Sequence, residues 1–453
     1  MILLNPKTEE ARQLFLEGSL VFSKMEQNGF RVDVDYCKEQ VKDLNEQMRD
    51  IEEKILSSKE GRIWTGKYGH NTKLLSEEQL KYVLYDKLKL RTKEETRSGK
   101  QSTNEKVLHG FDLPFTNNVL RLRKLNKVAN TYLKNFIDLS VEGYLHPSFN
   151  LNLVSTYRSS SSNPNFQNIP IRDKEWKRVL RRAIISRPGS RIVEIDFKRI
   201  EVGVSACYHK DPNMIRYEED LTTDMHRDAA MDCFLLTSEE LSRNKAIRQE
   251  GKNKFVFPAF YGSYYKQIAV DLWEVAQELE LDSTPLSVHL ASQGLNTFRQ
   301  FENHIKSVES KFWGERFKVY AQWKKDYYQE YLQKGYIHMY TGFTCSGFMR
   351  RNEVVNYPIQ GSAFHVNLKS IILINKELER RAMRTKLIGQ IHDSLIADVP
   401  KEEFYIFMAI AKRVMTKQIR EIYPWLIVPV RIEVEATPVD GSWLEKEEIP
   451  IAT

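Results

Sequence analysis

The sequence predicts a mixed α/β protein, with a sheet core assembled from separated segments and helical lobes placed before it and inserted into it. Three observations lead to this prediction. Residues 1–150 carry helix-start signals, residues 191–208 read as a strand followed by a helix, and residues 385–399 read as two short strands joined by a turn. The 453 residues suffice for about two to four domain-sized units or one large multi-lobed body.

Helix-start signals dominate the N-terminal third. Ser76-Glu-Glu-Gln79 and Ser102-Thr-Asn-Glu105 both fit the capping box, in which a hydroxyl and a side chain three residues later satisfy each other's backbone groups. Between them, residues 91–103 are polar, basic and poor in apolar anchors, and we predict a mobile loop there. After the first box, apolar residues recur at helical spacing: Leu80, Val83, Leu84 and Leu88.

Residues 119–137 are amphipathic and predict a helix with one basic face. Two interpretations fit this face: a solvated surface, or a helix lying along phosphates. Taken alone, the solvated surface is the better interpretation. The cations of this face are Arg121, Arg123, Lys124, Lys127 and Lys134.

Three further elements are predicted towards the C-terminus. Thr237-Ser-Glu-Glu240 is another capping box, which we expect to open a long helix through the basic residues 243–254. Residues 312–333 are aromatic-rich and read as helix, and residues 428–439 read as a final strand of the core.

Composition excludes several classes of protein. The chain is 41% hydrophobic and 28% charged, as expected of a globular protein and not of a disordered one. No apolar run reaches the roughly 18 residues of a spanning helix, so no membrane partner is expected. The N-terminus lacks the pattern of a secretory signal. The four cysteines form no CxxC pair, which predicts neither a zinc site nor a disulfide framework and favours the cytoplasm.

The basic residues are unevenly distributed. The net charge is only +7, but residues 174–191 carry seven cations against one Glu, and residues 243–254 carry five against one. Basic stretches are more often solvated faces than binding sites. Because these two flank the segment around Asp196, they raise the odds of a polyanionic partner.

Two aspartates are candidates for a single metal site. Asp196 follows the strand-like run IVEI, and Asp393 lies at the predicted turn of residues 385–399. On neighbouring strands they could hold two Mg²⁺ ions, because Mg²⁺ prefers oxygen ligands and needs few carboxylates when phosphates supply the rest. Two metal ions about 3.5–4 Å apart would clamp both oxygens of a phosphoryl transfer. For either aspartate alone, a surface turn residue is the better interpretation.

The second basic stretch contains cations and aromatic residues at helical spacing. Arg248 and Lys252 are four residues apart, as are Phe257 and Tyr261, so each pair shares one face of a helix. Such a helix can hold a nucleoside triphosphate, with its cations on the phosphates and an aromatic ring against the base. Aromatic pairs at this spacing are more often core packing.

Together these segments resemble the polymerase module of family A DNA polymerases, the bacterial polymerase I type. Asp196-Phe-Lys-Arg-Ile-Glu201 resembles motif A (DYSQIEL), Arg248-x3-Lys252 with Phe-Tyr261-Gly262 resembles motif B, and Gln390-Ile-His-Asp393 resembles motif C (QVHDE). Further matches in family order are Arg158 with SSSSNPNFQNIP (159–170), Asp224-Met-His226-Arg227, and Asn356-Tyr-Pro-Ile-Gln360-Gly. The resemblance is good over residues 115–445 and weaker before them.

The resemblance implies a fold and a division into domains. It implies the right-hand architecture: a palm with an antiparallel sheet, helical fingers and a helical thumb. The implied boundaries are a thumb and N-terminal helical region over 1–145, a first part of the palm over 146–222, fingers over 223–345, and a second part of the palm over 346–453.

The resemblance also implies a role for each matching residue. Asp196, Asp393 and the main chain of Phe197 would bind two Mg²⁺ ions, for which Mn²⁺ can substitute. Glu201 would crowd the 2′ position of the sugar and so reject ribonucleotides. His226, Arg248 and Lys252 would hold the incoming triphosphate, Lys252 would protonate pyrophosphate, Phe257 would lie beside the sugar, and Tyr261 would stack at the template base. The residues implied to contact primer-template DNA are Arg158, Asn165, Gln167, Asn356, Gln360 and His392.

The sequence departs from the family pattern at three points. Motif B holds one residue too many between Lys252 and Phe257, which turns a side chain by about 100° unless a π-helical turn absorbs it; the alternative register places Val256 and Phe260 in the aromatic positions. Ser394 stands where the family has Glu, so we expect altered metal use. Lys198 and Arg199 replace Ser and Gln, and Arg199 is a candidate phosphate contact.

Beyond the polymerase module, the sequence supports expectations about activity and partners. The thumb-like region starts near residue 10 and no DxE exonuclease pattern precedes it, so we expect no 3′→5′ exonuclease. The expected partners are primer-template DNA and deoxynucleoside triphosphates, and we expect a monomer. A separate exonuclease, helicase or processivity factor is left open as a further partner, as is an origin as a compact enzyme of a bacterial virus (phage). Two other functions stay open: a single-subunit RNA polymerase, which Glu201 disfavours, and a catalytically inactive DNA-binding scaffold.

Overall fold

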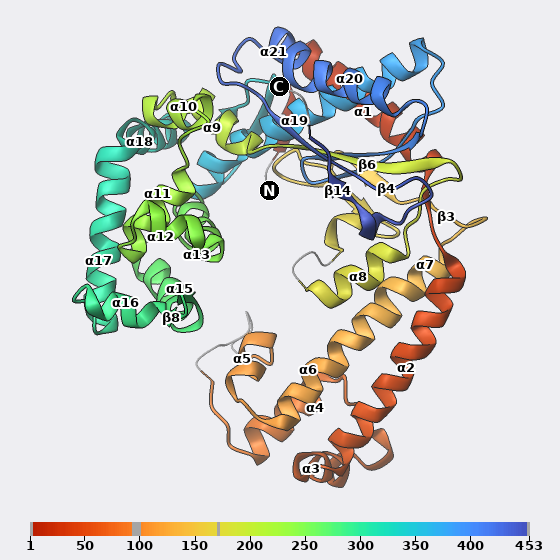
Figure 1. Ribbon diagram of the computed structural model, residues 1–453, viewed down its shortest axis with the longest axis vertical. Helices are drawn as coiled ribbons and strands as arrows, with labels where there is room; N and C mark the ends of the chain where they lie inside the picture. Colours follow the sequence, from red (N-terminus) through yellow and green to blue (C-terminus); the bar gives the residue numbers. More distant parts are fainter. Residues whose placement is uncertain (1–2, 93–100, 170–172, 451–453) are drawn as a thin grey trace.

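A sheet-containing body with two helical extensions makes up the molecule (Figure 1). The computed structural model describes residues 3–92, 101–169 and 173–450. Most of the segment for which we predicted a mobile loop, residues 93–100, lies outside these ranges. No helix in the described ranges is both long enough and apolar enough to cross a membrane.

Five antiparallel strands form the sheet of the body, in the order β11-β12-β6-β13-β14. All seven residues of β12 are buried, as expected for a strand covered on both faces. The predicted strand–helix over 191–208 and the predicted strand pair over 385–399 are confirmed. The final strand, predicted over 428–439, is shorter at both ends and spans only Ile432–Ala436. The bounds are β6 Ser190–Phe197, β11 Lys386–Ile391, β12 Ser394–Pro400, β13 Ile432–Ala436 and β14 Glu447–Glu448.

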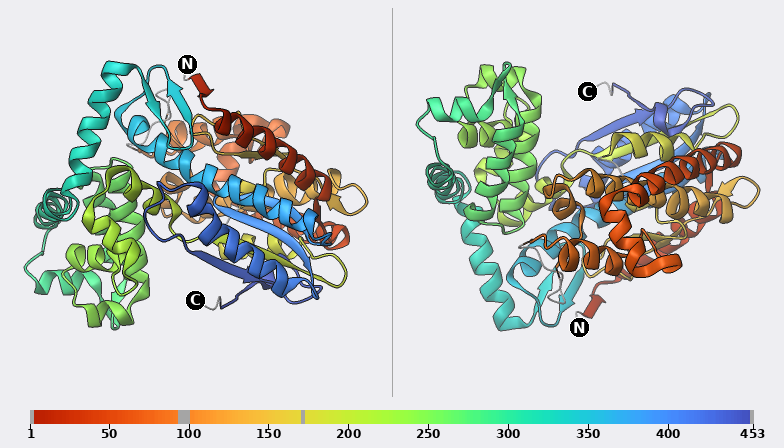
Figure 2. Two further views of the ribbon diagram at one scale, coloured as in Figure 1. Left: turned by 90° about the horizontal axis from the view of Figure 1, so that it is seen from above. Right: turned by 90° about the horizontal axis from the view of Figure 1, so that it is seen from below.

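Long helices cover one face of this sheet (Figures 1 and 2). α19 (Arg351–Arg380) contacts β12 and lies against α1 (Glu9–Asn28), which contacts β11. α20 (Phe404–Lys412) also contacts β12. The middle of α19 is buried from Gly361 to Leu368, so this helix is fixed in the core while its first turns stay accessible.

The first extension is an arm of antiparallel helices (Figure 1). α2 (Val34–Ser57) packs along α6 (Pro114–Asn126), which continues through a π-helical turn (η3, Lys127–Leu133) into α7 (Lys134–Asp138). The predicted helix over 119–137 is therefore confirmed. Its cations are partly committed within the protein: Arg121 forms two hydrogen bonds of 2.6 and 2.7 Å to Glu175, and Lys124 lies 2.7 Å from Glu105.

One of the two predicted helix caps in the arm is misplaced. Ser76 caps α4 (Glu77–Lys81) as predicted, accepting from the Gln79 amide at 3.3 Å. α5 (Glu105–Gly110) is capped by Asn104, whose side chain accepts from the Val107 amide at 2.9 Å, and not by Ser102. Asn is as good an N-cap as Ser, and it lies directly before the helix.

Aromatic rings join the base of the arm to the body. Phe30 stacks on Phe166 with ring centroids 4.2 Å apart, Phe136 lies 5.9 Å beyond, and Trp443 lies 6.5 Å from both Phe30 and Phe166. Gly389 of β11 makes this packing possible, because a Cβ there would lie 2.2 Å from the Phe30 ring. We call these four rings the aromatic joint.

The second extension is a helical lobe on the other side of the body (Figure 1). Its predicted capping box at Thr237 and Glu240 is confirmed, but the long helix predicted to follow is wrong. The chain breaks at Asn244 (φ −119°, ψ 69°), whose side chain donates to the Glu240 carbonyl at 2.8 Å and to Asp282 at 3.1 Å. Asn breaks helices readily because it forms such local hydrogen bonds. The predicted helix over 312–333 is confirmed as η6 (Phe312–Arg316) and α18 (Lys318–Lys334).

Shorter elements complete the chain. In the arm and its junction with the body these are β1 Leu3–Pro6, β2 Phe30–Arg31, α3 Lys59–Tyr68, η1 Gly69–Asn71, η2 Tyr82–Lys87, β3 Tyr144–Leu145, β4 Ser148–Asn150, β5 Ser160–Ser162, η4 Phe166–Asn168 and α8 Lys174–Arg182. In the lobe and the remainder they are α9 Ile200–His209, α10 Pro212–Glu219, α11 Met225–Phe234, α12 Ser238–Arg243, α13 Lys245–Glu250, η5 Gly251–Val256, α14 Phe257–Phe260, α15 Tyr265–Glu278, β7 Glu280–Leu281, β8 Thr284–Pro285, α16 Leu286–Ser292, α17 Phe298–Lys311, β9 Tyr336–His338, β10 Phe343–Ser346, η7 Arg413–Gln418, α21 Ile419–Ile422 and η8 Trp443–Glu445.

Candidate active site

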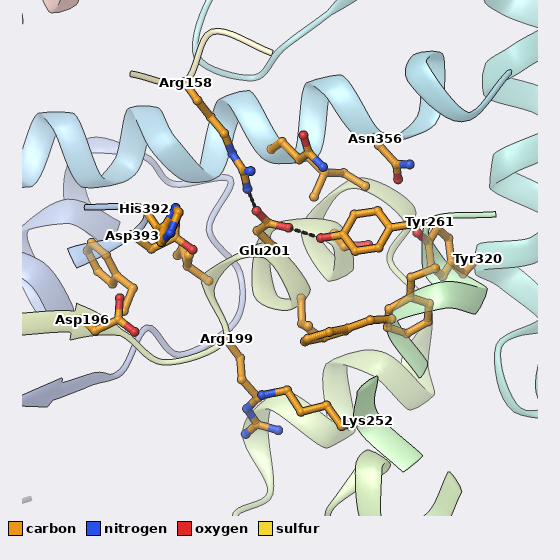
Figure 3. A pocket seen from close by; sticks show the side chains of 18 residues that line it. Arg158, Asp196, Arg199, Glu201, Lys252, Tyr261, Tyr320, Asn356, His392 and Asp393 are labelled. Carbon is orange, nitrogen blue, oxygen red and sulfur yellow. Dashed lines mark hydrogen bonds and ion pairs between the residues drawn. The ribbon is translucent and has the colours of Figure 1, made fainter. Parts of the chain in front are cut away.

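A cavity of about 380 Å³ lies where the sheet, α9, α14 and the start of α19 meet (Figure 3). Segments that are far apart in the sequence meet there: the end of β6, the β11–β12 turn and the helices of the lobe. Most of the residues singled out from the sequence line it. These are Arg158, Asp196, Phe197, Arg199, Glu201, Lys252, Phe257, Tyr261, Asn356, Gln360, His392 and Asp393.

The sheet register brings the two candidate metal ligands together. Ser394 of β12 pairs directly with Asp196 of β6, so Asp393 and Asp196 are less than about 10 Å apart at their Cα atoms. Asp393 follows His392 in a two-residue hairpin turn, and His392 has the positive φ (53°) that such a turn takes at its first position. Both carboxylates lie side by side at one end of the cavity (Figure 3).

The electrostatics of this pair fit a bound cation. Burial, the neighbouring Asp393 and nearby glutamates raise the pKa of Asp196 to about 7, and burial also raises the pKa of Asp393. Neither carboxylate has a hydrogen-bond or ion-pair partner among the described residues. Two unpartnered carboxylates in one cavity are the hard oxygen donors that Mg²⁺ prefers, and a cation would relieve their repulsion.

Ser394, which stands where the family has a third carboxylate, forms a hydrogen bond within its own hairpin. The Ser394 hydroxyl donates to the Ile391 carbonyl at 2.8 Å and so closes the hairpin from within. On the opposite side of Asp196, Glu433 of β13 is its cross-strand partner, but this carboxylate forms an ion pair with Lys198. Asp196 and Asp393 are thus the two acidic groups at this end of the cavity that are not already committed.

Glu201 lies at the centre of the cavity and has two partners. It accepts a hydrogen bond of 2.9 Å from the Tyr261 hydroxyl and forms an ion pair with Arg158 (Figure 3). Glu201 lies in the first turn of α9, and its carboxylate points into the space between Asp393 and Tyr261. Contacts on both oxygens fix the orientation of this side chain.

Cationic groups gather on the side of the cavity facing the lobe. Arg199 and Lys252 both line it, with their charged ends close together (Figure 3). Burial and the neighbouring Arg248 lower the pKa of Lys252. Arg248 itself lies behind the lining and is held by Asp224, with Nε 2.6 Å from Oδ2. A polyanionic ligand would find here cations that the protein neutralises only in part.

His226 is the other predicted triphosphate ligand behind the lining. Burial and the positive charge of Lys252 lower its pKa to about 3, so the imidazole is neutral. Its ring centroid is 5.8 Å from that of Phe257, and neither ring nitrogen has a hydrogen-bond partner in the described part of the chain. A neutral buried imidazole with an N–H to spare can donate to a ligand oxygen.

The extra residue of motif B is absorbed by a π-helical turn. The turn η5 spans Gly251–Val256, directly after α13, and α14 follows it. With this turn, Phe257 and Tyr261 both line the cavity. Of the pair in the alternative register, Phe260 also lines it, whereas Val256 is fully buried and does not. Gly251 lets η5 approach α11, because a Cβ there would lie 2.7 Å from that of Ala230.

Comparison with known proteins identifies the family. A sequence profile of DNA polymerase family A matches residues 34–443. The chain belongs to DNA polymerase family A. It is 26% identical over 460 residues to DNA polymerase I of Bacillus subtilis and 28% identical over 446 residues to the thermostable DNA polymerase I of Thermus aquaticus. These alignments cover 97% and 95% of this chain but only 46% and 48% of the relatives, so the chain spans about half their length.

A solved structure shows the same fold. The POL domain of Pol1 from M. smegmatis, solved with DNA primer-template and dNTP, matches 95% of this chain and 70% of its own chain, with a TM-score of 0.76 and 21% sequence identity. This agreement confirms the right-hand fold of mixed helices and antiparallel sheet. The body, arm and lobe thus form a family A polymerase fold.

Two of the residues expected to hold DNA in this family A chain lie outside the cavity. Asn165 is exposed on the segment before η4. Gln167 is half-buried and donates to the Ser159 hydroxyl at 3.0 Å and to Gln390 at 3.3 Å. The other four residues line the cavity as expected: Arg158, Asn356, Gln360 and His392. Asn356 and Gln360 lie about one turn apart on α19.

Three residues that hold the site residues of this family A chain in position were not identified from the sequence: Gln390, Asp224 and Glu218. Gln390 is fully buried and joins Gln167 and Ser159 to the His392 carbonyl, so it braces the turn that carries Asp393. Asp224 holds Arg248 and caps α11, accepting from the His226 amide at 3.0 Å. Glu218 is buried 3.6 Å from Arg199. Gln390 and Asp224 belong to matched motifs, which was an available signal; nothing local marks Glu218.

Proposed function

We propose that this chain is a template-directed DNA polymerase that extends a primer 3′ end with deoxynucleoside triphosphates. The observation that carries the proposal is the shared cavity of Asp196 and Asp393, with Glu201 at its centre and Lys252 opposite. Membership of family A and relatives described as DNA polymerase I support the same reaction.

We assign metal binding to Asp196, Asp393 and the main-chain carbonyl of Phe197. Two Mg²⁺ ions held there would supply Lewis-acid stabilisation of the phosphoryl transfer and activation of the primer hydroxyl, and Mn²⁺ can substitute for Mg²⁺. The two carboxylates contribute the negative charge that attracts these ions, and the hairpin fixes Asp393 against the strand that carries Asp196. With Ser394 committed to its own hairpin, the expectation of altered metal use stays a prediction.

We assign the triphosphate to the cationic side of the cavity. Arg199, Arg248 and Lys252 provide charge, and neutral His226 provides a hydrogen-bond donor. The lowered pKa of Lys252 eases proton transfer to the departing pyrophosphate, because an ammonium with a pKa nearer neutrality is a stronger acid. Phe257 then lies beside the sugar, Tyr261 at the template base, and Glu201 at the 2′ position.

We assign primer-template DNA to the space between arm and lobe. Arg158, Gln360 and His392 would meet the growing end, with Asn165, Gln167 and Asn356 helping to hold the duplex. Residues 1–145, which include the arm, would be the thumb and N-terminal helical region. Residues 223–345, which include the lobe, would be the fingers, and 146–222 with 346–453 would be the palm. Binding is expected to weaken steeply with salt, because cations that contact phosphates displace counterions.

The test of the proposed function is primer extension with Mg²⁺ and one matched deoxynucleotide. The wild-type chain should add one nucleotide to the primer, and Asp196→Ala should add none while still binding primer-template. Absence of extension by the wild type, at protein concentrations where it binds the duplex, would refute the proposal.

Phe257 provides a prediction about sugar recognition. A Phe lacks the hydroxyl that can take the place of the missing 3′-OH of a dideoxynucleotide, so the wild type should discriminate against dideoxynucleotides. Phe257→Tyr should relieve this by about fivefold or more, the equivalent of one hydrogen bond. Competition between deoxy and dideoxy forms of one nucleotide measures it, with Phe260→Tyr as the matched control. No change in Phe257→Tyr would favour the alternative register, in which Val256 lies beside the sugar.

Other expectations stay predictions. The chain should release no nucleotide from a mismatched primer 3′ end, which a 3′→5′ exonuclease assay checks with labelled primer. We expect a cytoplasmic monomer, and a mass measurement in solution tests its oligomeric state.

A further inference from the structure

A single phenylalanine between β10 and α19 projects into solvent. The Phe348 side chain is 87% exposed, more than any other large apolar side chain in the described ranges. Its neighbour Met349 is 2% exposed, so the two residues point in opposite directions. Isolated surface apolar residues are common, and exposure alone would need no explanation.

The backbone around Phe348 is held rigidly. The buried Tyr331 hydroxyl donates to the Gly347 carbonyl at 2.6 Å and accepts from the Met349 amide at 2.8 Å. One hydroxyl of α18 therefore fixes the peptide groups on both sides of Phe348. Gly347 has a φ of 113°, a conformation that side-chain-bearing residues rarely adopt. The exposed ring is thus displayed by a fixed turn and is not the tip of a loose loop.

Positive charge follows directly in the chain. Arg350 and Arg351 are both exposed and form no ion pair within 4 Å among the described residues, and one carboxylate lies beside them: that of Glu353, which accepts a hydrogen bond of 2.6 Å from the Arg350 amide. Arg351 also lies near Lys324, whose Nζ is 3.1 Å from the centre of the Trp313 ring. One exposed aromatic ring beside unpaired cations is the combination that binds single-stranded nucleic acid, by stacking on a base and pairing with phosphates.

This region is continuous with the candidate active site. A second cavity, of about 200 Å³, is lined by Arg351, Asn352, Lys324 and Trp313, and it shares Phe260 and Asn356 with the first. Phe348 precedes Arg351 by three residues, so their Cα atoms are within about 11 Å. Arg351 thus links the second cavity to the turn that displays Phe348.

We propose that Phe348 is a stacking platform for an unpaired base of the template strand ahead of the insertion site. The proposal rests on the proposed polymerase function and adds a binding site on the strand that has not yet been copied. The neighbouring cations favour this occupant over a protein partner, because an apolar protein surface would require a broader apolar patch than one ring.

Equilibrium binding to two primer-templates tests the proposal. They share one duplex and carry template 5′ overhangs of one or eight nucleotides, and fluorescence anisotropy with chelated metal measures the affinities without turnover. Phe348→Ala should weaken binding to the long overhang about fivefold or more and leave binding to the short overhang unchanged. Phe348→Trp should retain the wild-type preference. Tyr405→Ala is the matched control, because Tyr405 is 82% exposed on α20, and it should change neither affinity.

The possible outcomes separate the two proposals. If Phe348→Ala binds both overhangs like the wild type, or weakens both equally, the stacking platform is wrong. If Phe348→Trp behaves like Phe348→Ala, stacking is also refuted. If the wild type binds neither duplex and extends no primer, the polymerase function fails, which primer extension on the short overhang shows independently of Phe348.

Discussion

Asp393→Asn is expected to bind primer-template as tightly as the wild type and to extend it at least about a thousandfold more slowly. Asn keeps the size of the side chain but removes the charge that holds the cations. Metal-ion stabilisation of a phosphoryl transfer amounts to several kcal/mol, and each 1.36 kcal/mol is a factor of ten in rate. DNA affinity should not fall, because the change removes a negative charge near phosphates.

Single-turnover extension and anisotropy measure the two quantities on the same preparation. Asp35→Asn is the matched control, since its carboxylate is 95% exposed at the start of α2 and does not line the cavity. Chelation with EDTA should abolish extension by the wild type, and added Mg²⁺ should restore it. If Asp393→Asn extends the primer within tenfold of the wild-type rate, Asp393 does not bind the catalytic metal ions.

Glu201→Ala is expected to make the enzyme accept ribonucleotides. Glu201 is fixed by Arg158 and Tyr261, so it cannot move aside for an additional hydroxyl. Forcing extra volume into a packed site costs about 1–3 kcal/mol, and removal of the carboxylate should reduce discrimination against ribonucleotides by about 5–150-fold. The ratio of kcat/KM for a deoxynucleotide and its ribonucleotide measures the effect.

Glu201→Gln separates shape from charge. Gln has nearly the same volume, so steric exclusion predicts that this variant keeps most of the discrimination although its ion pair with Arg158 is lost. Equal loss in the Gln and Ala variants would show that exclusion depends on the charge and not on the crowding. An unchanged kcat/KM ratio in Glu201→Ala would show that another residue excludes ribonucleotides.

Local sequence patterns predicted the strands, helices and turns of the site better than the tertiary contacts that bring them together. The strand before Asp196 and the turn at Asp393 were predicted, because period and turn chemistry are local properties. The π-helical turn that contains Lys252 was one of two alternatives that the length of motif B left open. The register that opposes Ser394 to Asp196 depends on a contact across almost 200 residues, which no local pattern encodes. Glu218 was missed for the same reason.

The basic stretch at 174–191 shows how local reading can mislead. Arg181 is buried with its guanidinium 4.6 Å from the Trp443 ring, and Arg187 lies 3.0 Å from the buried carboxylate of Asp398. Several of these cations therefore hold the protein together and are not available to nucleic acid. A one-dimensional charge count cannot tell an exposed cation from one stacked in the core.

The aromatic joint fixes the base of the arm, so the length of the arm multiplies any rotation at that base. α2, which starts four residues after Phe30, is about 36 Å long. A rotation of about 5° at the joint would displace the far end of α2 by about 3 Å, so small changes in ring packing set the position of the distal helices.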